Sequence, residues 1–275
     1  MGASLAAALR AVDFASHIVG IDENPESLAL AVERGWLDRG AAELGPDAAD
    51  IVVLATPVGA MPDLLACLQP LISARAVITD MGSVKGPVAQ AAAELSLPRF
   101  VPGHPIAGAE RSGPSAASAA LFVKRVVVLT PREGCDPEAV AVVRAMWEAV
   151  GAYVLITDAG VHDRMVAYTS HLPHILAFAC ADFLAEEAED HDLYPFVGAG
   201  LRDFLRIAGS DPVMWRDVCQ ANAVLLAPAL VAYGERLAAY GRALVAGDFA
   251  SLQARFAKAR DFRETLIRET DRGEH

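Results

Sequence analysis

A histidine and a serine, each placed just after an apolar run, are the residues of this chain best suited to proton chemistry. His104 lies in the stretch VPGHPIAG, and Ser83 lies in DMGSVKG. Proline restricts the backbone of the residue before it, so Pro105 is predicted to hold His104 on a rigid loop after a strand. Histidine titrates near neutral pH and can accept a proton from a hydroxyl. Because ligands of open α/β sheets bind at the carboxyl ends of the strands, we expect Ser83 to face the same cleft.

Several neighbouring residues have simpler interpretations. Ser83 could cap a following helix, a position that serine favours. Lys85 is expected to be a solvated or phosphate-side charge rather than a base. His162 and Asp163 open a helical segment, where they form either a helix cap or a hydrogen bond that faces the cleft, and the sequence leaves both open.

The first residues of the chain resemble part of a dinucleotide-binding unit. Such a unit has a strand, a glycine-rich turn, a helix, a second strand and an acid at that strand's end. Residues 1–13 are predicted as the helix, with Gly2 as the last glycine of the turn. Asp22 ends the second strand, where it would bind the ribose hydroxyls of NAD and disfavour NADP, or instead cap the turn DENP. Thr56 and Pro57 add cofactor contacts or form an ordinary strand-to-helix turn.

The first strand and the earlier glycines of such a unit are not found before Gly2. We therefore expect an N-terminally truncated nucleotide-binding domain, from a start assigned too late or from a real truncation. The neighbouring strands would lose hydrogen bonds and apolar contacts. This 275-residue form is accordingly predicted to bind NAD weakly or to fold poorly.

The elements that must position these residues follow from the apolar pattern. Short apolar runs alternate with alanine-rich stretches in the first half, as in strands buried on both faces of a parallel sheet. The pattern predicts an α/β fold, Rossmann-like and doubly wound with a mainly parallel sheet, over residues 1–157. Residues 158–275 show helical spacing and are predicted to form an all-α dimerisation domain. The predicted strand segments are residues 17–22, 50–57, 76–80, 99–105, 125–131 and 152–158.

Composition and charge exclude several classes of protein. The net charge of −12 argues against a nucleic-acid partner, which requires a basic face. The four cysteines form no CxxC pair, as is typical of a reduced, cytoplasmic protein. No uninterrupted apolar run reaches about 18 residues, so no membrane span is expected. His171 and His174 are spaced like metal ligands, but Pro173 lies between them and no metal is expected.

Four motifs in order, DxGSVKG, GHPIAG, SHLPH and RDFLRIAxSDPxMW, closely resemble those of prephenate dehydrogenase and its relatives, the arogenate and cyclohexadienyl dehydrogenases of tyrosine biosynthesis. The resemblance covers essentially the whole chain, apart from the front of the glycine turn. It implies NAD-dependent oxidative decarboxylation of prephenate to 4-hydroxyphenylpyruvate, or of arogenate to tyrosine. It also implies that His104 accepts the proton of the substrate C4 hydroxyl and that Ser83 helps to place this hydroxyl, the imidazole and the nicotinamide.

The resemblance assigns further residues to the substrate. Arg206 would hold a substrate carboxylate, for which the planar guanidinium fork is suited. His174 would lie on the substrate side. Glu110 and Asp203 would pair with the arginine and gate the pocket, and Trp215 would reach the active site from the partner subunit.

Two other functions stay open. A non-catalytic or cofactor-deficient dimeric homologue is suggested by the absent glycines. A β-hydroxyacid-type dehydrogenase would share a nucleotide-binding half followed by a helical half. Such enzymes usually rely on a lysine in the helical half, where Lys258 is the only lysine beyond Lys124.

Overall fold

The computed structural model describes residues 1–45, 49–108 and 113–273 of the chain. It divides into two compact units, Met1–Leu225 and Leu226–His275. The domain boundary predicted at residue 157 falls within the first unit and stays a prediction.

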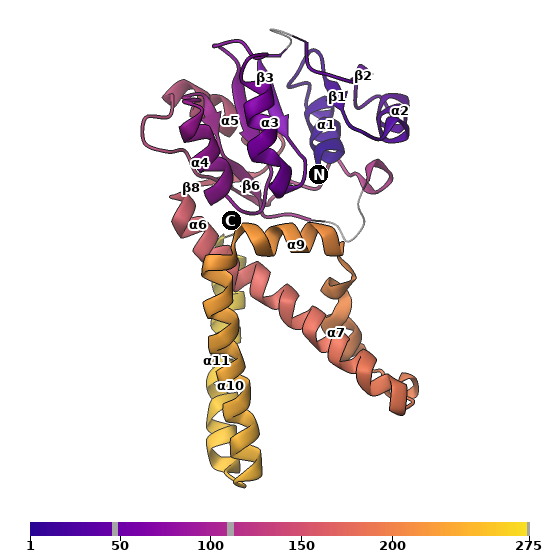
Figure 1. The fold of residues 1–275 in the computed structure, drawn as a ribbon, viewed down its shortest axis with the longest axis vertical. Helices are drawn as coiled ribbons and strands as arrows, with labels where there is room; N and C mark the ends of the chain where they lie inside the picture. The colour runs from indigo at the N-terminus through magenta and orange to yellow at the C-terminus, as the bar shows by residue number, and fades with distance from the viewer. Residues whose placement is uncertain (46–48, 109–112, 274–275) are drawn as a thin grey trace. The chain divides into compact units, whose positions relative to one another are not determined.

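The described residues of the first unit contain three small sheets whose strands are mostly parallel (Figure 1). The strands pair in parallel as β1 with β2, β3 with β4, β4 with β5, and β7 with β8, and only β6 and β7 pair antiparallel. Each predicted strand segment contains at least one of these strands, and β2 was not predicted. Their bounds are β1 Val19–Ile21, β2 Arg39–Ala41, β3 Ile51–Leu54, β4 Val77–Asp80, β5 Phe100–Val101, β6 Gly103–Pro105, β7 Val126–Leu129 and β8 Tyr153–Ile156.

Helices cover these strands in the order expected of a doubly wound fold, which confirms the predicted fold class. Side-chain caps begin two of them: the Asn24 carboxamide oxygen accepts from two backbone N–H groups of α2, and Asp136 accepts from one of α5. The helices of this half are α1 Gly2–Ala11, α2 Pro25–Glu33, α3 Met61–Leu68, α4 Gly86–Glu94 and α5 Pro137–Ala149, with short 3₁₀ turns η1 Val58–Ala60 and η2 Pro114–Ala116.

The β1–β2 sheet does not hydrogen-bond to the β3–β4–β5 sheet among the described residues. In the usual doubly wound order the first strand lies between the second and the fourth, and β1 and β3 occupy those two flanking positions. Helix α1 packs against both sheets: Ala6 contributes to the cluster around Ala31 and Leu37, and Leu5 contributes to the cluster around Val77. Apolar contacts through α1 therefore connect strands that no shared ladder joins.

After β8 the first unit is helical, as predicted. Asp158 caps α6 by accepting from the N–H groups of Gly160 and Val161. The helix continues into α7 through one π-helical stretch, which ends just before Pro173. Proline lacks an N–H and clashes with the preceding turn of a regular helix, so local widening is expected there. The elements are α6 Ala159–Val166, η3 Ala167–His171, α7 Leu172–Asp190, η4 Tyr194–Phe196, α8 Ala199–Leu205, η5 Arg206–Gly209 and α9 Pro212–Ala221.

Helix α9 packs on the nucleotide-binding half rather than away from it. Trp215 and Val218 belong to the same buried cluster as Leu54, Val58 and Met61. This cluster explains why the first unit extends to residue 225, well past the last strand. It also brings the α9 side chains to the carboxyl end of β3.

The second unit is a helical hairpin formed by most of α10 (Ala223–Val245) and by α11 (Phe249–Gly273). Gly247 in the connecting turn has a φ of 66°, a conformation that glycine adopts without strain. Tyr240 stacks on Phe256 with ring centroids 5.8 Å apart, which places the two helices side by side (Figure 1).

Helix α10 leaves much of its apolar surface uncovered within the chain. By length and composition alone it could cross a membrane, with a mean hydropathy of 1.2. This differs from the expectation drawn from uninterrupted apolar runs, because charged residues interrupt α10 without lowering its average far enough. A test of length and composition is weak support for a membrane span, since helices that pack in soluble assemblies also pass it.

Candidate active site

The site is built at the end of β4 and along β6. His104 is the middle residue of β6, opposite Val128 of β7. The prediction that His104 lies on a loop was therefore wrong. Pro102 separates β5 from β6 because it has no N–H to donate, and the chain pairs with β7 directly afterwards. His104 is held by a strand ladder, which is a more rigid support than a loop.

A fully buried ion pair anchors β6 to β4. Asp80, the last residue of β4, pairs with the Lys85 ammonium and also accepts hydrogen bonds from the N–H of Gly82 (2.8 Å) and of Gly103 (3.1 Å). Lys85 Nζ donates a further hydrogen bond to Gly103 O (2.7 Å). The expectation that Lys85 is solvated was wrong, since both side chains of the pair are 0% exposed. This pair fixes the residue directly before His104.

A hydrogen-bonded row of side chains connects His104 to α6. His104 Nδ1 lies 2.8 Å from His162 Nε2, and His162 Nδ1 lies 2.8 Å from Asp163 Oδ1. His162 is 3% exposed and Asp163 is 5% exposed. Burial lowers the pKa of His104 well below its ordinary value, and the nearby positive charges of Lys85, His162 and His171 act in the same direction. The His104 imidazole is therefore neutral at pH 7.

Asp163 also caps α4. Its carboxylate accepts from the backbone N–H of Lys85 (2.8 Å) and of Gly86 (2.7 Å). Burial alone would raise the pKa of Asp163, but the hydrogen bonds from His162 and from these two amides lower it overall. The interpretation of Ser83 as the cap of this helix was thus wrong, because Asp163 takes that place. Of the two roles left open for His162 and Asp163, the hydrogen bond toward the site is present, because His162 faces His104. The cap of their own helix is Asp158, and Asp163 caps α4 instead.

Three predicted substrate residues lie together on the helical side. His174 stacks on Trp215 with ring centroids 4.0 Å apart and an interplanar angle of 24°. Burial lowers the pKa of His174, and the positive charge of Arg206 lowers it further while a hydrogen bond to Ser170 opposes the shift. Trp215 is 8% exposed and packs against His174 of its own chain, and the expectation that it reaches the active site from a partner subunit stays a prediction.

Asn222 connects this cluster to the histidine row, and no sequence motif pointed to this residue. Its Nδ2 donates to Asp163 O (2.9 Å) and to His171 Nδ1 (3.1 Å). Burial lowers the pKa of His171 to about 4. Within the described residues, the buried nitrogens His171 Nε2 and Trp215 Nε1 have no hydrogen-bond partner. Buried polar atoms are nearly always paired in folded proteins, so these two are suited to a polar ligand.

The predicted cofactor residues lie at the start of α1 and after β1 and β3. A side chain at Gly2 would place its Cβ 2.9 Å from Ala55 Cβ, so only glycine allows this close contact between α1 and the end of β3. No side chain caps α1, which leaves its first N–H groups for a ligand. Asp22 is exposed and accepts from Asn24 N–H (2.8 Å), as expected if it caps the turn DENP. Thr56 and Pro57 are exposed beyond β3. These features fit a bound dinucleotide.

For two predicted substrate residues the structure, as far as it describes the chain, shows no contact with the site. Asp203 is exposed on α8, three residues before Arg206. Glu110 lies outside the described residues. No cluster of three or more His, Cys, Asp or Glu side chains suited to a metal ion occurs in the described part of the chain.

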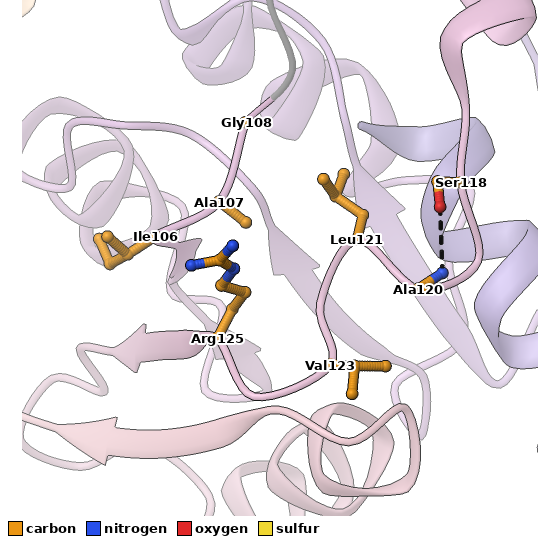
Figure 2. A pocket seen from close by; sticks show the side chains of 8 residues that line it. All are labelled: Ile106, Ala107, Gly108, Ser118, Ala120, Leu121, Val123 and Arg125. Atoms are coloured by element: carbon orange, nitrogen blue, oxygen red, sulfur yellow. Dashed lines mark hydrogen bonds between the residues drawn. The ribbon is translucent and has the colours of Figure 1, made fainter. Parts of the chain in front are cut away.

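A separate cavity of about 390 Å³ lies beside the segment that follows β6 (Figure 2). Figure 2 shows the Arg125 side chain among Ile106, Ala107 and Leu121. None of the predicted site residues that the structure describes lines this cavity.

Comparisons with known proteins match both halves of the chain. Residues 5–156 match the family profile described as prephenate dehydrogenase, nucleotide-binding domain. Residues 158–258 match the profile described as prephenate dehydrogenase, dimerization domain. The chain belongs to the prephenate dehydrogenase family. The motif resemblance seen in the sequence is thereby confirmed.

Individual members of the prephenate dehydrogenase family are similar along most of the chain. A prephenate dehydrogenase of Bacillus subtilis is 34% identical over 81% of this chain, and a cyclohexadienyl dehydrogenase of Zymomonas mobilis is 36% identical over 66% of it. The chain spans 62% and 63% of the length of these two relatives, respectively.

Solved structures of prephenate dehydrogenase family members have the same fold. A crystal structure of the A. aeolicus prephenate dehydrogenase in complex with hydroxyphenyl propionate and NAD⁺ is 34% identical, with a TM-score of 0.90 over 97% of this chain and 94% of that one. A Synechocystis arogenate dehydrogenase is 29% identical, with a TM-score of 0.80 over 96% of each chain.

Proposed function

We propose that this chain catalyses the NAD-dependent oxidative decarboxylation of prephenate to 4-hydroxyphenylpyruvate, or of arogenate to tyrosine. The observation that carries the proposal is His104, a neutral imidazole held on β6 within a family of such dehydrogenases. A neutral histidine can take the proton of the substrate C4 hydroxyl. Ser83, half-buried after β4, would help to orient that hydroxyl.

The helical side would hold the charged end of the substrate. Arg206 offers a carboxylate two parallel hydrogen bonds, and its charge already acts on His174. The stack of His174 on Trp215 would line the substrate side, with Trp215 Nε1 as an available donor. Asp203 and Glu110 would pair with the arginine at the entrance. The positions of Arg206, His174 and Trp215 support these roles, and the role of Glu110, which lies outside the described residues, rests on the resemblance alone.

The cofactor would lie at the carboxyl ends of β1 and β3. Gly2, Asp22, Thr56, Pro57 and Ser83 are the residues that would hold it. NAD bound there would supply the acceptor for the hydride of C4, and the substrate dienone would then lose its ring carboxylate as carbon dioxide to give a phenol. His104 would hold the hydroxyl proton, while Arg206 keeps the substrate oriented. The product is aromatic, so the chain mainly has to position the reactants and the charges.

The assembly and location form part of the same proposal. We place the protein in the cytoplasm as a homodimer formed through residues 158–275, with no nucleic-acid or membrane partner. The match to a dimerization domain and the uncovered apolar surface of α10 support this arrangement. The four cysteines, all free, fit a reducing compartment.

An assay of NADH formation with prephenate and with arogenate tests the proposal. We expect turnover with at least one substrate, and His104→Asn should lower kcat by about 10²-fold or more with a modest change in KM. The matched control is His191→Asn, which changes an exposed histidine. An unchanged kcat in His104→Asn would remove this residue from the mechanism.

The alternative functions give different results in the same assay. A cofactor-deficient homologue, for which the unpaired edges of β1 and β3 are the supporting observation, would form no NADH and would fail to bind NAD in calorimetry. A β-hydroxyacid-type enzyme would lose activity in Lys258→Ala, whereas the present proposal expects no effect at this exposed α11 residue. The weak NAD binding expected from the sequence would be measured in the same calorimetry.

A further inference from the structure

The row Asp163–His162–His104 determines where the protons lie on both imidazoles. An ionised carboxylate can only accept hydrogen bonds, so the 2.8 Å contact requires a proton on His162 Nδ1. When His162 carries this proton alone, its Nε2 has a lone pair. The 2.8 Å contact to His104 Nδ1 therefore requires a proton on that nitrogen.

The consequence concerns the other nitrogen of His104. With its proton on Nδ1, neutral His104 carries a free lone pair on Nε2, which makes no hydrogen bond to the described residues. We propose that Asp163 and His162 act as positioning residues that hold His104 in this tautomer, so that Nε2 is the nitrogen that receives the substrate proton. This inference rests on the proposed function for its chemical meaning, but the tautomer itself can be measured without any substrate.

The surroundings keep the row in one arrangement. Asp163 stays ionised because its carboxylate also accepts from the first amides of α4, at 2.8 and 2.7 Å. Asn222 Nδ2 donates to the backbone oxygen of Asp163 and so fixes the turn of α6 that carries both residues. Outside this row the Lys85 ammonium is the charge that acts on His104, and it opposes a positive charge there; His171 would act in the same direction only when it is protonated.

A proton taken up by His104 can move along the same row. When Nε2 accepts the substrate proton, Nδ1 can release its own proton to His162 Nε2. The positive charge then lies on His162, next to the Asp163 carboxylate, and no proton is lost or gained overall. A carboxylate placed behind a histidine in this way orients the neutral ring and stabilises the charged one.

Nitrogen-15 NMR of histidine-labelled protein at neutral pH tests the tautomer directly. We expect His104 and His162 each to carry a proton on Nδ1 and a bare Nε2. The signals are assigned by comparison with His104→Asn and His162→Gln. A wild-type His104 that carries its proton on Nε2, or that exchanges freely between tautomers, would overturn the inference. This result does not depend on catalysis, so a chain inactive with both substrates would contradict the proposed function alone.

Asp163→Asn is the decisive variant. With its NH₂ at the Oδ1 position, the asparagine donates to His162 Nδ1, which moves the His162 proton to Nε2 and forces His104 to carry its own proton on Nε2; with its NH₂ at the Oδ2 position it faces the Gly86 N–H and the row is kept. We expect the switched tautomer to appear as a populated form in the NMR spectrum and kcat to fall by about tenfold or more with little change in KM. Asp158→Asn is the matched control, because it makes the same change at the cap of the same helix and should leave kcat and the tautomer unaltered.

A pair of His162 variants guards against misfolding of Asp163→Asn. The Gln side chain in His162→Gln can donate to Asp163 and accept from His104, so the tautomer should be kept and kcat should stay within about tenfold of the wild type. His162→Phe keeps the ring volume but offers no acceptor, so the His104 tautomer should become mixed and kcat should fall further. Equal kcat values and equal tautomers in these two variants would contradict the role given to His162.

Discussion

Single residues in this site act through their burial as much as through their chemistry. The pKa of His104 and of His171 is lowered mainly by burial, so both rings are neutral at pH 7. A neutral histidine can serve as a base. A buried carboxylate stays ionised only when it has strong hydrogen-bond partners, as Asp163 has. Arg206, by contrast, is exposed, as its proposed role of substrate anchor requires.

Arg206→Ala is predicted to raise KM with little change in kcat. Loss of a desolvated carboxylate partner costs about 2–4 kcal/mol, which corresponds to a rise in KM of roughly 30- to 1000-fold. Steady-state kinetics with prephenate measures this. Arg206→Lys keeps the positive charge without the planar guanidinium, so its KM should lie between those of the wild type and Arg206→Ala. Arg202→Ala, at an exposed neighbouring arginine, is the control. An unaltered KM in Arg206→Ala would contradict the role of this arginine.

Much of the candidate site was predictable at this scale because each motif carries its own chemical signature. His104 and Ser83 were picked out by residue type and by neighbours such as proline and glycine, whereas His174 and Arg206 were assigned only through the motif resemblance to the family. Lys85 was misjudged because a lysine is usually solvated, and only its position below β6 makes it a buried partner of Asp80. Asn222 was missed because a lone asparagine after a helix has no distinguishing pattern.

At the scale of elements, the position of β6 depends on the start of α4. Lys85 precedes α4, pairs with the end of β4 and donates to Gly103 O. The amides of the same turn are capped by Asp163 from α6. Strand, helix and histidine row are therefore connected through one buried turn.

Lys85→Met is predicted to destabilise the chain strongly. Removing one partner of a buried ion pair leaves an unpaired charge, at a cost of about 3–5 kcal/mol. Urea unfolding monitored by circular dichroism measures the free energy of unfolding. The double variant Asp80→Asn with Lys85→Met should recover part of the loss, because no buried charge is left alone. Lys124→Met, at an exposed lysine, is the control and should change the free energy of unfolding little. An effect as small as this in Lys85→Met would contradict the structural role of the Asp80–Lys85 pair.

His171 in the π-helical stretch is predicted to make stability depend on pH. Its pKa is about 4 in the folded chain and 6.5 in the unfolded chain, so below pH 6.5 the unfolded state binds the proton first. Stability is therefore full above this pH and falls as pH drops toward 4, by about 3 kcal/mol from this group. Urea unfolding between these pH values should show a shallower dependence in His171→Gln. The same slope in both proteins would contradict this prediction.

At the scale of the whole molecule, the apolar surface of α10 requires a partner. Val231 is 65% exposed and Leu237 is 54% exposed within the chain. A soluble protein rarely leaves such a surface uncovered, and the family match describes this region as a dimerization domain. A second copy of the chain, as proposed above, would cover this helix without any membrane.

The double variant Val231→Glu with Leu237→Glu is predicted to shift the protein from dimer to monomer. Two buried, unpaired carboxylates in an apolar interface would cost several kcal/mol, on the order of a thousandfold or more in the dimer dissociation constant. Sedimentation equilibrium measures the mass of each form. Gln253→Glu, at an exposed α11 position, should leave the dimer intact. A wild-type monomer would contradict the dimer, and a protein that stays in solution only with detergent would instead favour a membrane-bound α10.

The sequence by itself determined the types of element, their order and the family. Apolar period, turn residues and motif spacing are local properties, and they are present before the chain folds. Only the tertiary structure decided which side chains meet. His104 bonds to a residue 58 positions away, Asn222 to one 59 positions away, and the Lys85 amide to one 78 positions away. Such contacts depend on how α6, α9 and the turn before α4 pack together, and no local pattern encodes that packing.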